Sequence, residues 1–113
     1  MKEILMIALA FILLDVVSGL VSAFANKNVS SSIMRQGLYH KIAEIMLMGV
    51  AAVSQYAISY TELAGIVPDM VFQSVVIYVI GMELISILEN ICKTNPNLKL
   101  DVIFKMFNQE KED

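Results

Sequence analysis

The residues most able to do chemistry in this sequence are acidic side chains inside long apolar segments. Asp15 lies near the middle of the apolar block 4–25, and Glu83 is the single charged residue among the 19 residues of block 70–88. A charged side chain at the centre of a bilayer costs about 2.5–3.5 kcal/mol on insertion scales, so it is normally turned toward protein or water. These carboxyl groups therefore predict polar contacts in an assembly or around a conducting opening.

Other polar side chains extend this pattern along block 70–88 and just beyond it. In a helix, steps of three and four residues return to the same side. This rule groups Val76, Val79, Glu83, Ser86 and Asn90. We expect the stripe from Glu83 to Asn90, which also contains Glu89, to face the helix bundle or the lumen of a pore.

Small residues accompany Asp15 on the first block. Ser18 and Ser22 are four residues apart, as are Gly19 and Ala23. Small side chains let helix backbones approach closely in lipid, where the hydrophobic effect does not drive association. We expect Gly19, Ser22 and Ala23 to make close helix contacts. For Asp15 the alternatives are pairing by hydrogen bonds, contact with water, or a protonated carboxyl satisfied by serine hydroxyls in a static bundle.

The sequence offers no residues for several other kinds of chemistry. Cys92 is the only cysteine and His40 the only histidine, so neither an intrachain disulfide nor a Cys/His zinc site is possible. It contains no Gly-rich phosphate loop and no nucleophile with a base and an orienting group. The net charge of −3 provides no basic surface for duplex nucleic acid. We therefore expect that the protein is not an enzyme and that it has no cofactor, no metal and no nucleic-acid partner.

Composition identifies the elements that must position these residues. The chain has 113 residues, is 58% hydrophobic and has a mean hydropathy of +0.70, whereas soluble domains are about 45–50% apolar. All basic residues lie outside the three apolar blocks, which are 4–25, 45–60 and 70–88. The sequence therefore predicts one all-α integral membrane domain, homo-oligomeric, with three transmembrane helices at about 4–25, 42–60 and 70–90.

The second predicted span has few polar residues from which its buried side could be inferred. One possible packing face is lined by Ala43, Met46, Val50, Val53 and Ala57. Lys41 and Glu44 are three residues apart at its start, and we expect them to form an ion pair at the membrane interface.

Charges in the connections predict the orientation. Connection 26–41 carries three basic residues and no acid, turn 61–69 carries two acids and no base, and tail 91–113 carries four lysines. By the positive-inside rule, the connection and the tail are cytoplasmic, while the turn and the N-terminus are external.

The two ends of the chain carry further signals. The sequence Ala23-Phe24-Ala25 imitates a signal-peptidase site, but Lys2 is offset by Glu3 and Asp15 interrupts the apolar run, so we expect an uncleaved first span. A short helix is expected to begin at residues 30–32. Near the C-terminus, an i, i+3, i+4, i+7 pattern predicts an amphipathic helix on the inner membrane face or against a neighbour. Its apolar residues are Leu100, Ile103, Phe104 and Phe107.

An ordered set of residues resembles the toxin-secretion and phage-lysis holins of bacteriophages, a group that includes the holin-like exporter of clostridial large toxins. The resemblance covers most of residues 5–92, and its most specific part is the Glu-x-x-Ser-Ile-Leu-Glu-Asn block at 83–90. The other matching positions are Asp15, Gly19, Ala23, Lys27, Ser31, Ser32, Gly37 and Lys41.

The resemblance implies a protein that accumulates in the bacterial inner membrane and then oligomerises into lesions. These lesions would release an endolysin or a toxin without binding it specifically. The partners implied are other copies of the chain and the lipid bilayer. A small multidrug-type transporter or ion conduit is the alternative, because such exporters also carry an acidic residue within their first span. They have four spans and aromatic-rich sites, whereas this sequence predicts three spans and has no tryptophan.

Overall fold

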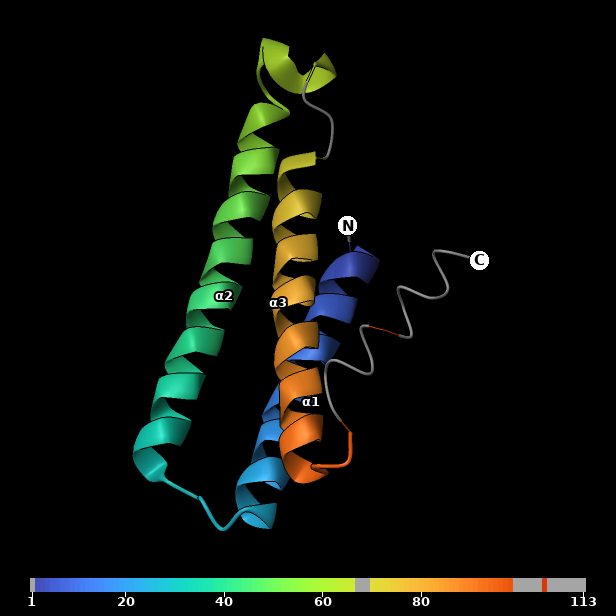
Figure 1. Cartoon of the computed structure of the whole chain (residues 1–113). Coiled ribbons are helices and arrows are strands. Elements are labelled where there is room, and N and C mark those ends of the chain that lie inside the picture. Colours follow the sequence, from blue (N-terminus) through green and yellow to red (C-terminus); the bar gives the residue numbers. More distant parts are fainter. Residues whose placement is uncertain (1, 67–69, 99–104, 106–113) are drawn as a thin grey trace.

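The computed structural model describes residues 2–66, 70–98 and 105, and their regular structure is entirely helical. In order, the elements are α1 (Lys2–Ala25), α2 (Ser31–Ile58), a short 3-10 helix η1 (Glu62–Gly65) and α3 (Met70–Thr94) (Figure 1). The three α-helices are long and apolar enough to cross a membrane, as the sequence predicts. The expected amphipathic helix over residues 100–107 lies, apart from residue 105, outside the described residues.

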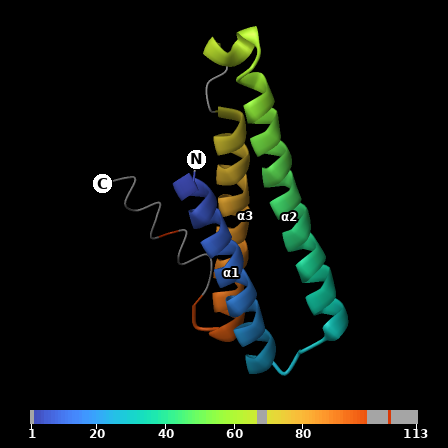
Figure 2. The same ribbon diagram turned by 180° about the vertical axis from the view of Figure 1, so that it is seen from behind.

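The helices run alternately up and down, and α3 packs against both of the others. α1 and α3 run in the same direction and α2 runs in the opposite one (Figures 1 and 2). The connection between α1 and α2 therefore lies at the same end of the bundle as the last turn of α3. η1 lies at the other end, beyond the last turn of α2.

α2 begins well before the predicted span. The Ser30 hydroxyl caps it by accepting a hydrogen bond from the backbone N–H of Ile33 at 3.5 Å. The helix expected to start at residues 30–32 does start there, but it continues without a break into the second span, because residues 31–41 contain no proline. Residues 31–40 are exposed, so the first turns of α2 extend away from the bundle.

The buried side of α2 differs from the predicted packing face. Met46, Val50 and Val53 are 65%, 63% and 69% exposed. α2 is apolar on nearly every side, so its apolar residues alone do not indicate which side is buried. The side that packs inward repeats at steps of three and four residues and consists of Lys41, Glu44, Met48, Ala51 and Gln55.

The core is a thin layer of side chains from all three helices. It contains Ala8, Ile12, Met48, Ala51, Phe72, Val76 and Val79. Val76 and Val79 come from the predicted stripe of α3, and Glu83 follows them at 1% exposure. The buried apolar residues therefore lead directly into a buried polar region along the same face of α3.

Amide side chains from α2 and from the residue that follows α1 bind the two ends of α3. The side-chain oxygen of Gln55 in α2 accepts a hydrogen bond from the backbone N–H of Phe72 at 3.3 Å. At the other end, the side-chain amide of Asn26 donates to the backbone carbonyl of Lys93 at 3.2 Å. Terminal backbone groups of a helix have no partner within the helix, so these bonds satisfy two of them and fix the position of α3.

Candidate functional site

Lys41 is the centre of a buried polar cluster that joins the three helices. Its ammonium group donates hydrogen bonds to Oδ2 of Asp15 on α1 and to Oε2 of Glu83 on α3, the latter at 2.5 Å. The residues are 8%, 6% and 1% exposed, respectively. One lysine on α2 thus bridges two carboxylates on the other two helices.

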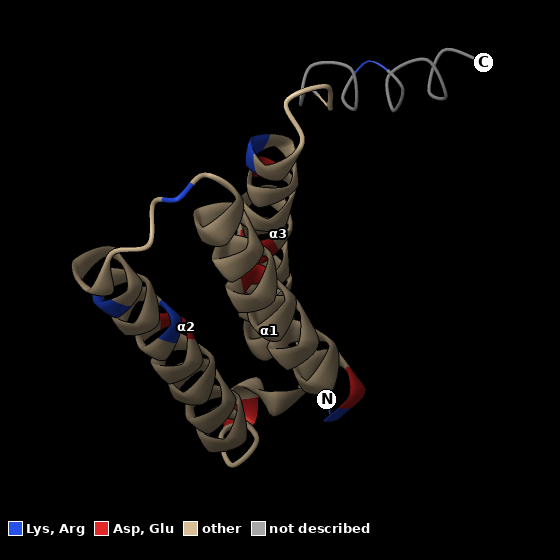
Figure 3. Ribbon diagram, turned by 90° about the horizontal axis from the view of Figure 1, so that it is seen from below, with Lys and Arg blue, Asp and Glu red and all other residues tan. Residues whose placement is uncertain are grey.

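The three residues lie at a common depth because of their positions along the helices. Asp15 precedes the end of α1 by ten residues, Lys41 follows the start of α2 by ten, and Glu83 precedes the end of α3 by eleven. At about 1.5 Å per residue, each lies about 15 Å from the same end of the bundle. Figure 3 shows this end, with basic residues near it and acidic residues within α1 and α3.

A second set of hydrogen bonds joins Asp15 to the polar stripe of α3. The Ser86 hydroxyl donates to Oδ1 of Asp15 at 2.6 Å, and the Asn90 amide donates to the same oxygen at 2.9 Å. The Asn90 amide also donates to the hydroxyl of Ser18 at 3.0 Å. Both oxygens of Asp15 therefore accept hydrogen bonds, as an ionised carboxylate can.

Glu44 of α2 lies beside Glu83 and lines the same cavity. Its Oε1 is 2.9 Å from Nε2 of His40, while its Oε2 is buried and has no hydrogen-bond partner among the described residues. A cavity of about 180 Å³ adjoins these groups and is lined by residues that include His40, Glu44, Glu83 and Glu89. One water needs roughly 10–15 Å³ of such space, so the cavity can hold water against the cluster.

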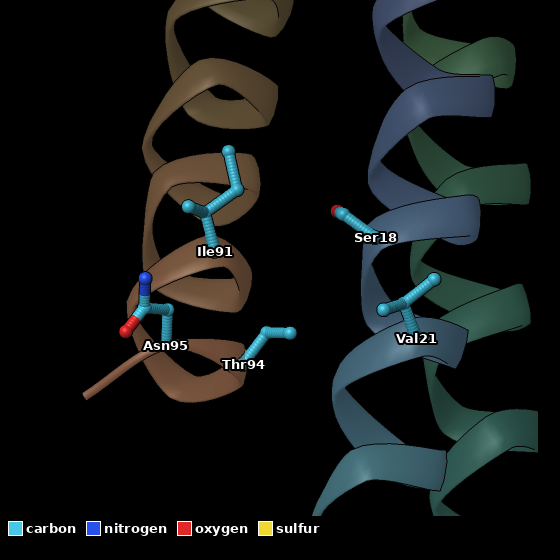
Figure 4. Close-up of a pocket in the computed structure, with 5 residues that line it drawn as sticks. All are labelled: Ser18, Val21, Ile91, Thr94 and Asn95. Carbon is cyan, nitrogen blue, oxygen red and sulfur yellow. The ribbon is translucent and has the colours of Figure 1, made fainter. Parts of the chain in front are cut away.

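A larger cavity, of about 260 Å³, lies between the last turns of α1 and α3 (Figure 4). Ser18 and Val21 line it from α1, and Ile91, Thr94 and Asn95 line it from the other side.

A Cβ atom added at Gly19 would lie 3.5 Å from the amide nitrogen of Asn90. The backbone of α1 therefore approaches the Asn90 side chain closely at this glycine.

The structure brings most of the predicted residues into one network. Asp15, Ser18, Glu83, Ser86 and Asn90 are linked to one another, directly or through Lys41, and Gly19 faces Asn90. The remaining three lie at its edges: Ser22 is buried, Ala23 is half-buried, and Glu89 is exposed beside the smaller cavity. Their roles in a pore or an assembly stay predictions.

The sequence-based interpretation of Lys41 and Glu44 is wrong. They do not form an interfacial pair, because Lys41 binds Asp15 and Glu83 while Glu44 binds His40. The signal that identifies them is spacing, since Lys41, Glu44 and Gln55 fall on one side of α2 with two small or flexible apolar residues between them. Lysine has a long side chain, which lets α2 reach Asp15 across the bundle.

The cluster does not resemble a metal centre. Among residues 2–66, 70–98 and 105, no three His, Cys, Asp or Glu side chains are arranged to hold a metal ion. The groups that are brought together are an ammonium, carboxylates, hydroxyls and an amide. Such a set can hold helices together, bind protons or line a polar opening.

Comparison with known proteins gives one match. No curated protein and no solved structure matches the chain. The model of the bacteriophage holin family matches residues 1–111, which is nearly the whole sequence. This is not an enzyme family, and its match agrees with three helices that are long and apolar enough to cross a membrane. The chain belongs to the bacteriophage holin family.

Proposed function

We propose that the protein permeabilises the bacterial inner membrane by oligomerising into lesions that release an endolysin or a toxin. Membership of the holin family suggests the permeabilising role. The observation that carries the proposal is the buried Lys41 cluster, which gives one chain two ways to satisfy its polar groups. In one arrangement the helices shelter them, and in the other they line water.

The closed arrangement explains how the chain resides in lipid without damage. Asp15, Lys41 and Glu83 are paired and hydrogen-bonded within a single chain. Their charges are therefore hidden from the hydrocarbon, which is the requirement for an ionisable group at this depth. The lipid-facing surface consists mainly of apolar side chains, such as Leu13 at 63% and Val50 at 63% exposure.

The open arrangement follows from separating the helices. Moving α2 away from α1 and α3 breaks both ion pairs of Lys41, and leaving one partner of a buried pair uncompensated costs about 3–5 kcal/mol. Lipid cannot offset this cost, whereas water or polar groups of other copies can. Separated helices are therefore stable only against polar groups of other copies or around an aqueous lumen, to which Asp15 and the Glu83–Asn90 stripe would turn.

The proposed orientation has an external N-terminus and a cytoplasmic tail. In the structure, the connection between α1 and α2 and the last turn of α3 lie at the same end of the bundle. This arrangement supports placing Lys27, Arg35 and Lys93 together on the cytoplasmic side, as the positive-inside rule requires. Cargo would pass through the lesion without a specific binding site.

Release of folded proteins from bacteria tests this function. Cells expressing the chain with a cytoplasmic fluorescent protein and an endolysin should release the protein and lyse after a delay. Passage of small dyes with retention of the folded protein would instead support a transporter or an ion conduit. Membranes that stay impermeable to dye and to folded protein while the chain is abundant would contradict both the holin and the transporter or conduit function.

A further inference from the structure

We propose that the smaller cavity contains a proton-binding site, in which Glu44 of α2 and Glu83 of α3 share one proton as a carboxylic acid–carboxylate pair. The first observation is the unpartnered Oε2 of Glu44. This residue is only 9% exposed, and its other oxygen already contacts His40. A buried carboxylate oxygen without a hydrogen-bond donor is rare in folded proteins. A proton bound at this carboxyl group or at a neighbouring one would supply the hydrogen bond.

The second observation is the neighbour of that oxygen. Glu44 and Glu83 line the same cavity, and their carboxyl groups lie within hydrogen-bonding reach of each other. Two ionised carboxylates offer only acceptors, so they repel each other and leave Oε2 unsatisfied. A single proton converts one of them into a donor and turns the repulsive contact into a hydrogen bond.

The charges around the site agree with one bound proton. The groups facing it are Asp15 from α1, His40 and Lys41 from α2, and Glu89 from α3. Lys41 donates to Asp15 and Glu83, so the three buried carboxylates and one ammonium carry a net charge of −2. One proton lowers this excess to −1.

The site can exchange its proton with water. The cavity of about 180 Å³ reaches the His40 side chain, which is 63% exposed, and it also borders the exposed Glu89. The inference does not rest on lesion formation, because it concerns the closed arrangement of one chain. An unopened protein would bind the proton equally well.

Infrared spectroscopy of the full chain in lipid tests the proposal. At neutral pH the spectrum should contain a carboxylic-acid C=O band that shifts in D₂O. Glu44→Gln and Glu83→Gln should each remove it, because glutamine supplies the missing donor without titrating. The matched control is Glu62→Gln in η1, an exposed position, which should leave the band unchanged.

Carbon-13 NMR of the unmodified chain with labelled Glu and Asp carboxyl groups provides a test that does not depend on folding of a variant. It should show one protonated glutamate at neutral pH, and all aspartates ionised. Fully ionised glutamates, or a band that persists in both glutamine variants and is lost in Asp15→Asn, would overturn the proposal.

Discussion

At the scale of single residues, the structure changes the role of Lys41. The sequence indicates that Asp15 and Glu83 are important because an acid inside an apolar block stands out. It does not indicate their partner, because the segregation of basic residues from the apolar blocks places Lys41 in a connection. The structure shows that α2 already includes this position and that its side chain reaches inward.

Replacing Lys41 by methionine should strongly destabilise the closed chain. Methionine keeps a flexible stem but removes the ammonium, so Asp15 and Glu83 lose their shared counter-charge. We expect a loss of about 3–5 kcal/mol, the usual cost of breaking a buried pair from one side. Thermal and denaturant unfolding in detergent measure this loss.

The control for this substitution is Arg35→Met, which removes a positive charge from an exposed turn of the same helix. It should change stability by less than about 0.5 kcal/mol. Equal stabilities of the Lys41 and Arg35 variants would show that the ion pairs contribute nothing.

At the scale of helices, prediction succeeds for α1 and α3 and fails for α2. Asp15 and Ser22 in α1 and Glu83 in α3, which the spacing groups with other polar residues, are buried, so these positions mark the faces that pack together. In α2 apolar residues surround the whole helix, and the packing face predicted from them is wrong. The polar positions Lys41, Glu44 and Gln55 would have identified the correct side.

Gly19→Leu should block permeabilisation without blocking membrane insertion. A Cβ atom at this position is in ordinary contact with Asn90, at 3.5 Å, but the larger leucine side chain must displace it. Asp15 and Ser18 then lose their shared amide donor. The timing of lysis, together with the amount of chain in the membrane fraction, measures the effect.

Two variants serve as controls for the glycine contact. Gly49→Leu puts the same side chain on α2, where an added Cβ atom has nothing within 4 Å, and should lyse cells normally. Gly19→Ala adds only the tolerated methyl group and should also be active. Normal lysis timing with Gly19→Leu would rule out this contact as a requirement.

Gln55→Leu should loosen the first turn of α3. It leaves the buried N–H of Phe72 without its acceptor, which costs about 1–3 kcal/mol. Faster amide hydrogen exchange in the first turns of α3 should report this loss. Gln73→Leu on the exposed side of α3 is the matched control and should leave exchange unchanged.

At the scale of the whole molecule, the number of spans and the helical class follow from the sequence, while the place where charges are sheltered does not. Asp15 and Glu83 could be satisfied by another copy or within the same chain, and spacing along one helix cannot distinguish these cases. The structure shows one chain satisfying both through Lys41. Charge burial in the closed arrangement therefore does not require an oligomer.

The proposed orientation predicts which connections react with reagents outside the cell. In a Cys92→Ser background, a cysteine at Ala64 should react with a membrane-impermeant maleimide on intact spheroplasts, whereas a cysteine at Asn28 should not. Both positions are exposed and lie at opposite ends of the bundle, so both should react after permeabilisation. Reaction at Asn28 alone would reverse the proposed topology.

The hydrogen bonds that the side chains of Gln55 and Asn26 make at the two ends of α3 have a consequence for how the molecule changes conformation. Turning α3 about its axis breaks its bond to Gln55 at one end and to Asn26 at the other, and it also pulls Glu83 away from Lys41. These losses coincide, so a partly rotated helix has no bonds of its own to stabilise it. We therefore expect rotation of α3 to be all-or-none, so that a population of chains divides into two species with few intermediates.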